Sequence, residues 1–143
     1  EDGSVAYLSV HRYPFYPGTG GLDETGSGKG LGLTVNVPLG AGAGDETYAA
    51  GFESALDGLL RRFRPDLILV SAGFDAHHRD PLGGMGLSGE GYERMTRALA
   101  AAADTFASGR LISVLEGGYD PDGTAEGALA HARVLAESAE PSH

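Results

Sequence analysis

Residues 67–82 read LILVSAGFDAHHRDPL, an apolar run that ends abruptly in charged and imidazole side chains. The apolar part, 67–71, is almost continuously hydrophobic, which predicts a strand buried on both faces of a parallel sheet. The polar part carries two carboxylates, two imidazoles and one guanidinium between Asp75 and Asp80. The segment therefore admits three interpretations: a metal site, a catalytic acid–base cluster, or a polar loop after a buried strand.

Three more apolar runs predict strands elsewhere in the chain. The runs at 5–10 and 111–115 are nearly continuous, so both are expected to be buried on two faces. The run at 33–37 alternates between apolar and polar residues, which favours a position nearer a sheet edge.

Helical periodicity follows the second, third and fourth predicted strands. The first helix is expected to begin with Asp45 as its N-cap and the second with Ser88. Asp120-Pro121 predicts the start of the third helix, because an N-cap is followed by proline at the first helical position. That helix is expected to end near Glu137.

The order of these elements predicts an α/β domain with a mainly parallel sheet and flanking helices. We expect the domain to cover residues 1–137 and to be followed by a frayed tail, 138–143. The long glycine-rich connection at 14–32 is typical of a functional or a disordered loop.

Composition excludes several classes of function. The chain has 143 residues, a formal net charge of −10 and no cysteine. The acidic charge argues against nucleic-acid and anionic-membrane partners, and any metal must bind to His, Asp or Glu. No apolar run approaches the ~20 residues of a membrane span and no signal peptide is recognisable, so we expect a cytoplasmic protein. Nine of the ten basic residues are Arg, which favours a bacterial source.

Three predicted strands are each followed at once by a residue capable of chemistry. His11 follows the first strand, Asp75 the third and Tyr119 the fourth. Because ligand sites in open parallel sheets gather at the carboxyl ends of the strands, these residues are expected to share a cleft.

The polar part of the opening segment favours function only for Asp75, which leaves the strand first. His77, His78 and Asp80 could add metal ligands, but residues this close in one loop cannot all converge on one ion. We interpret Asp80 and Arg79 as side chains that satisfy loop backbone groups, and both histidines as exposed.

The segment 115–120, LEGGYD, supports two interpretations. Gly117 and Gly118 allow the backbone to approach a ligand closely, and Tyr119 could then donate a hydrogen bond to a developing oxyanion. Alternatively, the segment is a turn with a packing tyrosine. A phosphate-binding loop, a nucleophile elbow and a dinucleotide fingerprint all fail in their glycine spacing.

Taken together, these segments resemble the C-terminal half of the histone deacetylase superfamily, and bacterial class II-like deacetylases, acetoin-utilisation proteins and acetylpolyamine amidohydrolases in particular. The resemblance extends over nearly the whole chain and implies the C-terminal half of an arginase/deacetylase-like fold. It rests on SVHRY at 9–13, FYPGTG at 15–20, VNVPL at 35–39, SAGFDAH at 71–77, DPL at 80–82 and LEGGYD at 115–120.

The resemblance also implies a role for each matching site residue. Asp75 corresponds to a zinc ligand, and Tyr119 to the catalytic tyrosine that hydrogen-bonds the substrate carbonyl. The remaining matches are the acyl-lysine channel positions Tyr16, Leu82, Gly117 and Gly118, and the positions Ser9 and Val10 of a structural potassium site.

Two signatures of that family have no counterpart in this sequence. The family's other zinc ligands lie in an Asp-x-Asp-x-His-His-Gly motif, and its general base and acid are a His-His pair further upstream. The strand that bears the first motif would lie between the strands predicted at 5–10 and 67–71. The chain therefore resembles a fragment or one half of a split protein.

Two hypotheses of function follow. The first is a zinc-dependent deacetylase of acetyl-lysine, acetylpolyamine or a similar amide, of which these residues alone would be inactive. The second is a non-catalytic half-domain, or a degenerate enzyme, that pairs with a partner such as a separate N-terminal half or a second copy.

Overall fold

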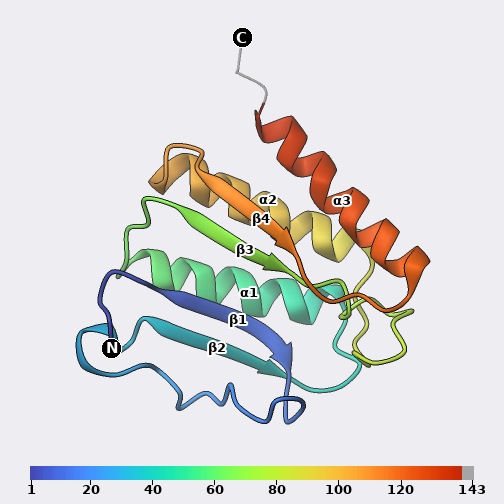
Figure 1. Cartoon of the computed structure of the whole chain (residues 1–143), viewed down its shortest axis with the longest axis horizontal. Helices are drawn as coiled ribbons and strands as arrows, with labels where there is room; N and C mark the ends of the chain where they lie inside the picture. Colours follow the sequence, from blue (N-terminus) through green and yellow to red (C-terminus); the bar gives the residue numbers. More distant parts are fainter. Residues whose placement is uncertain (140–143) are drawn as a thin grey trace.

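The computed structural model describes residues 1–139, in which parallel strands alternate with helices (Figure 1). The predicted α/β class is confirmed. The strands are β1 (Tyr7–Arg12), β2 (Thr34–Leu39), β3 (Ile68–Ala72) and β4 (Leu111–Leu115). The helices are α1 (Asp45–Leu60), α2 (Gly89–Phe106) and α3 (Pro121–Ala139), with a short 3-10 helix, η1 (Gly28–Gly30), in the glycine-rich connection.

The strands form two separate parallel pairs. β1 pairs with β2 in the register Tyr7 to Thr34, and β3 pairs with β4 in the register Ile68 to Leu111. Within residues 1–139 no ladder joins β1 to β3, although the two follow one another in the layer of strands (Figure 1).

One face of the β3–β4 pair is open, so the prediction that these strands are buried on both faces is wrong. Leu69 is 70% exposed, and Ile112 and Val114, on the same side of β4, are more than half exposed. The opposite face, which carries Val70 and Ser113, packs against the helices. The apolar composition of both strands is that of a two-sided sheet, whereas the described residues cover only one side.

The helix starts agree with the predicted positions, with one correction. Gly44, not Asp45, is the N-cap of α1. The Asp45 carboxylate instead accepts hydrogen bonds from the N–H and the hydroxyl of Ser88, at 2.9 and 2.7 Å, and so ties the start of α1 to the start of α2. Asp120 caps α3 as predicted, because its Oδ1 accepts the Gly123 N–H at 2.7 Å.

Helix α3 continues to Ala139, two residues beyond its predicted end, and the remainder of the predicted tail, 140–143, lies outside the described residues. None of the described helices is long and apolar enough to cross a membrane.

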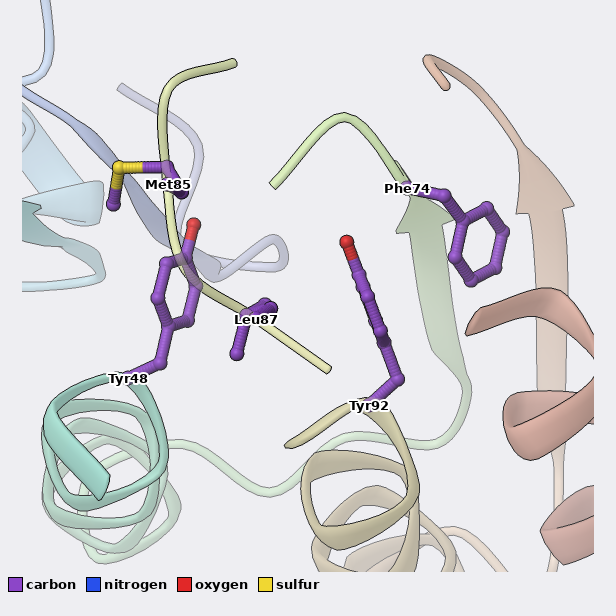
Figure 2. Close-up of a cluster of buried hydrophobic side chains, with 5 residues drawn as sticks. All are labelled: Tyr48, Phe74, Met85, Leu87 and Tyr92. Carbon is purple, nitrogen blue, oxygen red and sulfur yellow. The ribbon is translucent and has the colours of Figure 1, made fainter. Parts of the chain in front are cut away.

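The core lies beneath the loops that follow β1 and β3. Figure 2 shows Leu87 between the rings of Tyr48, from α1, and Tyr92, from α2. Val10 of β1 and Ala72 of β3 both pack against this cluster. Side-chain packing therefore joins the two strand pairs where no ladder does. The cluster consists of Tyr48, Phe74, Met85, Leu87 and Tyr92.

His131 of α3 connects three elements. The Thr96 hydroxyl donates to the carbonyl of Tyr92 at 2.7 Å, so His131 Nδ1 must donate to the Thr96 oxygen, which lies 2.7 Å away. His131 Nε2 then accepts the Ser113 hydroxyl of β4 at 2.8 Å. Burial lowers the pKa of this imidazole.

We expect His131 to make folding stability depend on pH. Its pKa is lower in the folded than in the unfolded protein, so its stabilising effect is fully present above the unfolded value of about 6.5 and is lost as the pH falls from there through the lower folded pKa. Urea unfolding of the full-length protein at a series of pH values should give a steeper loss for the wild type than for His131→Gln. Parallel curves for the two proteins would contradict this assignment.

Candidate active site at the carboxyl ends of the strands

Asp75 leaves β3 beside the segment that leaves β4. The pairing continues past both strands, because the Glu116 N–H donates to the Ala72 carbonyl at 3.0 Å and the Phe74 N–H to the Gly117 carbonyl at 2.7 Å. The Asp75 carboxylate lies over Gly117, where an added Cβ would stand 3.1 Å from Asp75 Oδ2. The two loops thus meet at one edge, as expected for neighbouring parallel strands.

The Asp75 carboxylate occupies an environment that disfavours its charge. Burial raises its pKa, and the nearby charge of Asp80 raises it further, against a smaller opposing effect of its own backbone N–H. Tyr48 lies in the same region, and its pKa is raised first by burial and then by the Asp75 charge. A half-buried carboxylate with this shift is stabilised by a cation, which suits a metal ligand.

Tyr119 is held by its backbone while its side chain remains accessible. Its N–H donates to Asp80 Oδ2 at 2.7 Å, and its side chain is 57% exposed. The alternative interpretation, a turn with a packing tyrosine, does not agree with that exposure. The hydroxyl is therefore available to a ligand above the loop.

Asp80 satisfies loop backbone groups, as predicted. Its Oδ1 accepts the N–H groups of Leu82 and Gly83, at 2.8 and 2.9 Å. Burial alone would raise its pKa, but hydrogen bonds from the N–H groups of Gly83, Tyr119 and Leu82 outweigh burial and lower it. The sequence did not indicate that one of these groups belongs to Tyr119, 39 residues away.

His77 is fully buried, so the prediction of an exposed imidazole is wrong for this residue. The ring lies against Gly123 of α3, where an added Cβ would stand 2.6 Å from Nδ1. Nδ1 accepts the Arg79 N–H at 3.2 Å, and Nε2 lies 3.5 Å from Glu126 Oε2. His78 is exposed, as predicted.

The Arg79 guanidinium forms ion pairs instead of satisfying backbone groups. It contacts the carboxylates of Asp120 and Asp122, at 3.2 and 2.8 Å. The prediction that the Arg79 side chain satisfies loop backbone groups is therefore wrong.

His11 is occupied by structural hydrogen bonds. Its Nε2 donates to the carbonyl of Gly20 at 3.0 Å, which leaves Nδ1 to accept the Ser9 hydroxyl at 2.8 Å. The imidazole therefore anchors the glycine-rich connection to β1. Val10 contributes its carbonyl to a 3.4 Å hydrogen bond from the Tyr48 hydroxyl.

Two of the four predicted channel positions, Tyr16 and Leu82, lie on loops that Arg12 connects. Its guanidinium carbon stands 4.2 Å from the centre of the Phe15 ring, and Nη1 donates to the Gly83 carbonyl at 3.3 Å. Tyr16, next to Phe15, is 90% exposed, and Leu82, next to Gly83, is 56% exposed. Both apolar side chains thus remain accessible to a ligand.

In the described part of the chain, no group of three or more His, Asp or Glu side chains could hold a metal ion. Asp75 fits the role of one carboxylate ligand, but a catalytic zinc site requires about three protein ligands. These residues alone therefore do not fit a complete zinc site.

Residues 1–135 match the Histone deacetylase domain. The chain is 43% identical over 122 residues to a probable deacetylase of Archaeoglobus fulgidus, covering 85% of this chain and 34% of that protein. It is 42% identical over 142 residues to the histone deacetylase HDA1 of Saccharomyces cerevisiae, covering 94% of this chain and 19% of that protein.

Solved structures of histone deacetylases also resemble this chain. The HD domain of HDA15 superposes with a TM-score of 0.87 at 39% identity, over 98% of this chain and 40% of that one. The histone deacetylase Clr3 also gives a TM-score of 0.87, at 40% identity, over 99% of this chain and 24% of that one. The fold and site define a partial deacetylase domain of the α/β class. The chain belongs to the histone deacetylase family and spans about a third or less of the curated relatives described above.

We expect Gly118→Ala to destabilise the full-length protein by about 1–3 kcal/mol. Gly118 has φ +147°, and an added Cβ would stand 2.5 Å from Thr124 Oγ1. Gly58→Ala, in α1, is the matched control because its Cβ would meet nothing within 4 Å. Urea unfolding should show a loss for the first variant and none for the second; equal stabilities would contradict the constraint.

Proposed function

We propose that the full-length protein containing this chain is a zinc-dependent deacetylase of acetylated lysine, acetylated polyamines or similar amides. The observation that carries the proposal is the placement of Asp75 and Tyr119 on adjacent loops, in a chain of the histone deacetylase family. The acidic net charge of −10 suits substrates that carry further positive charges, such as acetylated polyamines.

Asp75 is proposed as one zinc ligand, with the other ligands and the general base supplied from outside residues 1–143. Bound zinc supplies a Lewis acid that polarises the acyl carbonyl and lowers the pKa of a bound water. The raised pKa of Asp75 supports the assignment, since a divalent cation would stabilise the charged carboxylate.

The other site residues of this chain bind and orient the substrate. Tyr119 would donate its hydroxyl hydrogen to the carbonyl oxygen as negative charge develops there. Tyr16 and Leu82 would line the two sides of the acyl channel, because both are exposed on loops that Arg12 connects. Gly117 and Gly118 would let the substrate approach the backbone.

The proposal includes a structural potassium ion at Ser9 and Val10. Both residues lie in the middle of β1, and the Ser9 hydroxyl and the Val10 carbonyl are oxygen ligands of the kind that hard cations prefer. It also includes a bacterial source and a cytoplasmic location, for which the arginine-rich, acidic composition is the support.

We expect Asp75→Asn and Tyr119→Phe to separate metal binding from chemistry. In the full-length protein, Tyr119→Phe should retain zinc but lower kcat by about 100- to 1,000-fold, the usual cost of removing an oxyanion donor. Asp75→Asn should lose zinc as well as activity. Metal content by atomic emission and turnover of an acetyl-lysine peptide and acetylspermidine measure both effects.

Full activity of Tyr119→Phe would contradict the assigned role. Wild-type protein that holds zinc but turns over neither substrate would contradict the proposed function itself.

The purified 143-residue chain is expected to be inactive with added zinc, because one carboxylate cannot hold a catalytic zinc ion. The same assays on this chain measure the prediction. Robust turnover that Tyr119→Phe abolishes would overturn it.

The second candidate, a half-domain that needs a partner, is favoured by one specific observation. The β1–β2 and β3–β4 pairs share no ladder, and Leu69, Ile112 and Val114 form an exposed apolar face. Unpaired strand edges and apolar faces of this kind promote association. We propose the N-terminal half of the domain as the partner, whether it is covalently continuous or separate.

Light scattering after size-exclusion chromatography tests this partner. The isolated 143-residue chain should self-associate, and a co-expressed N-terminal half should convert it to a defined complex. A monodisperse monomer that ignores the added half would contradict this proposal.

A further inference from the structure

We infer that Asp80 is a positioning residue that holds Tyr119 and the Leu82 loop in a fixed relation to each other during catalysis. This inference rests on the proposed function, because it assigns Asp80 a role in placing the oxyanion donor relative to the channel wall. Asp80 itself is not proposed to contact substrate or metal.

The contacts of the carboxylate carry the inference. Oδ2 accepts the N–H of Tyr119 at 2.7 Å, whereas Oδ1 accepts the N–H groups of Leu82 and Gly83 at 2.8 and 2.9 Å. The side chain is only 8% exposed, so water competes little for these bonds. Hydrogen bonds to an ionised acceptor are about twice as strong as neutral ones.

The segment that carries Tyr119 needs such a restraint. Two glycines precede Tyr119, and Gly118 has a φ of +147°, a region that other residues rarely adopt. Glycine leaves the backbone free to take many conformations, so the direction of the tyrosine is poorly defined by local sequence. The hydrogen bond to Asp80 fixes the backbone immediately beyond that flexible pair.

The Leu82 loop is also held by contacts that do not come from Asp80, so it can serve as a fixed support for Tyr119. The Gly83 N–H bonds to Asp80 while its carbonyl accepts a hydrogen bond from Arg12 of β1. A side chain on Gly83 would overlap the carbonyl oxygen of Asp75. Asp80 therefore links Tyr119 to a backbone that is already packed against the proposed zinc ligand.

The start of α3 also has contacts that do not involve Asp80. Asp120 caps the helix through the Gly123 N–H, and Arg79 pairs with Asp120 and Asp122. Loss of the Asp80 carboxylate should therefore release Tyr119 without unfolding the helix that follows it. This separates a positioning role from a purely structural one.

Asp80→Asn in the full-length, zinc-loaded protein is the sharpest test because it preserves size. The amide has one acceptor oxygen and one donor nitrogen, so it cannot serve N–H groups on both sides. We expect the hydrogen exchange of the Tyr119 amide to accelerate and kcat to fall by about 10- to 100-fold, with zinc content and KM nearly unchanged. Asp80→Glu, which restores the charge, should recover part of kcat and keeps the test valid if the first variant folds poorly.

A double-mutant cycle distinguishes positioning from general damage. If Asp80 acts through Tyr119, Asp80→Asn should cost little further activity in the Tyr119→Phe background. Asp45→Asn is the matched control, since its carboxylate likewise joins two distant segments, by accepting two hydrogen bonds from Ser88. It should lower stability but leave kcat and Tyr119 exchange unchanged.

Unchanged exchange at Tyr119, or an equal loss of kcat in both backgrounds, would overturn the inference. Inactive wild-type protein would instead remove the proposed function, and the exchange measurement would still decide whether Asp80 restrains Tyr119.

Discussion

The structure depends on the packing of one aromatic cluster beneath the strand ends. β1 and β3 share no hydrogen bonds, so Tyr48, Leu87 and Tyr92 supply the surface on which both strand pairs rest (Figure 2). Apolar burial is non-directional, which allows it to hold two pairs without fixing a register between them. The same cluster lies directly under the loop of Asp75, because Phe74 belongs to it and Ala76 packs against it. The core therefore supports the candidate site directly.

This arrangement explains why buried polar groups concentrate in the loops after the strands. Backbone turns cannot form ladders, so their N–H groups need other acceptors when they are covered. Asp80 meets that need for three N–H groups, and Asp45 does so at the start of α2. A loop stabilised by carboxylates is rigid enough to carry a reactive side chain while leaving that side chain exposed.

Local patterns predicted most of the fold, because each strand and helix is encoded by the periodicity of its own residues. Contacts between distant segments were predicted less well. His77 was expected to be exposed, and the return of α3 across its loop buries it. Asp45 was expected to cap its own helix, yet its carboxylate oxygens accept hydrogen bonds from a distant residue, Ser88. No pattern within one segment records which other segment will lie against it.

In the candidate site, too, local features were predictable from the sequence and contacts between distant segments were not. Position alone predicted that Asp75 and Tyr119 lie at one edge, since parallel strands place their carboxyl ends together, whereas the roles expected of them came from the family resemblance. Their electrostatic relation was not predictable, because the pKa of Asp75 reflects burial and the charge of Asp80, both products of tertiary structure. Asp80 is negatively charged and firmly hydrogen-bonded, so it raises the free energy of a charged Asp75 unless a cation is present. One carboxylate thus orders the loops, and its charge favours cation binding by the other.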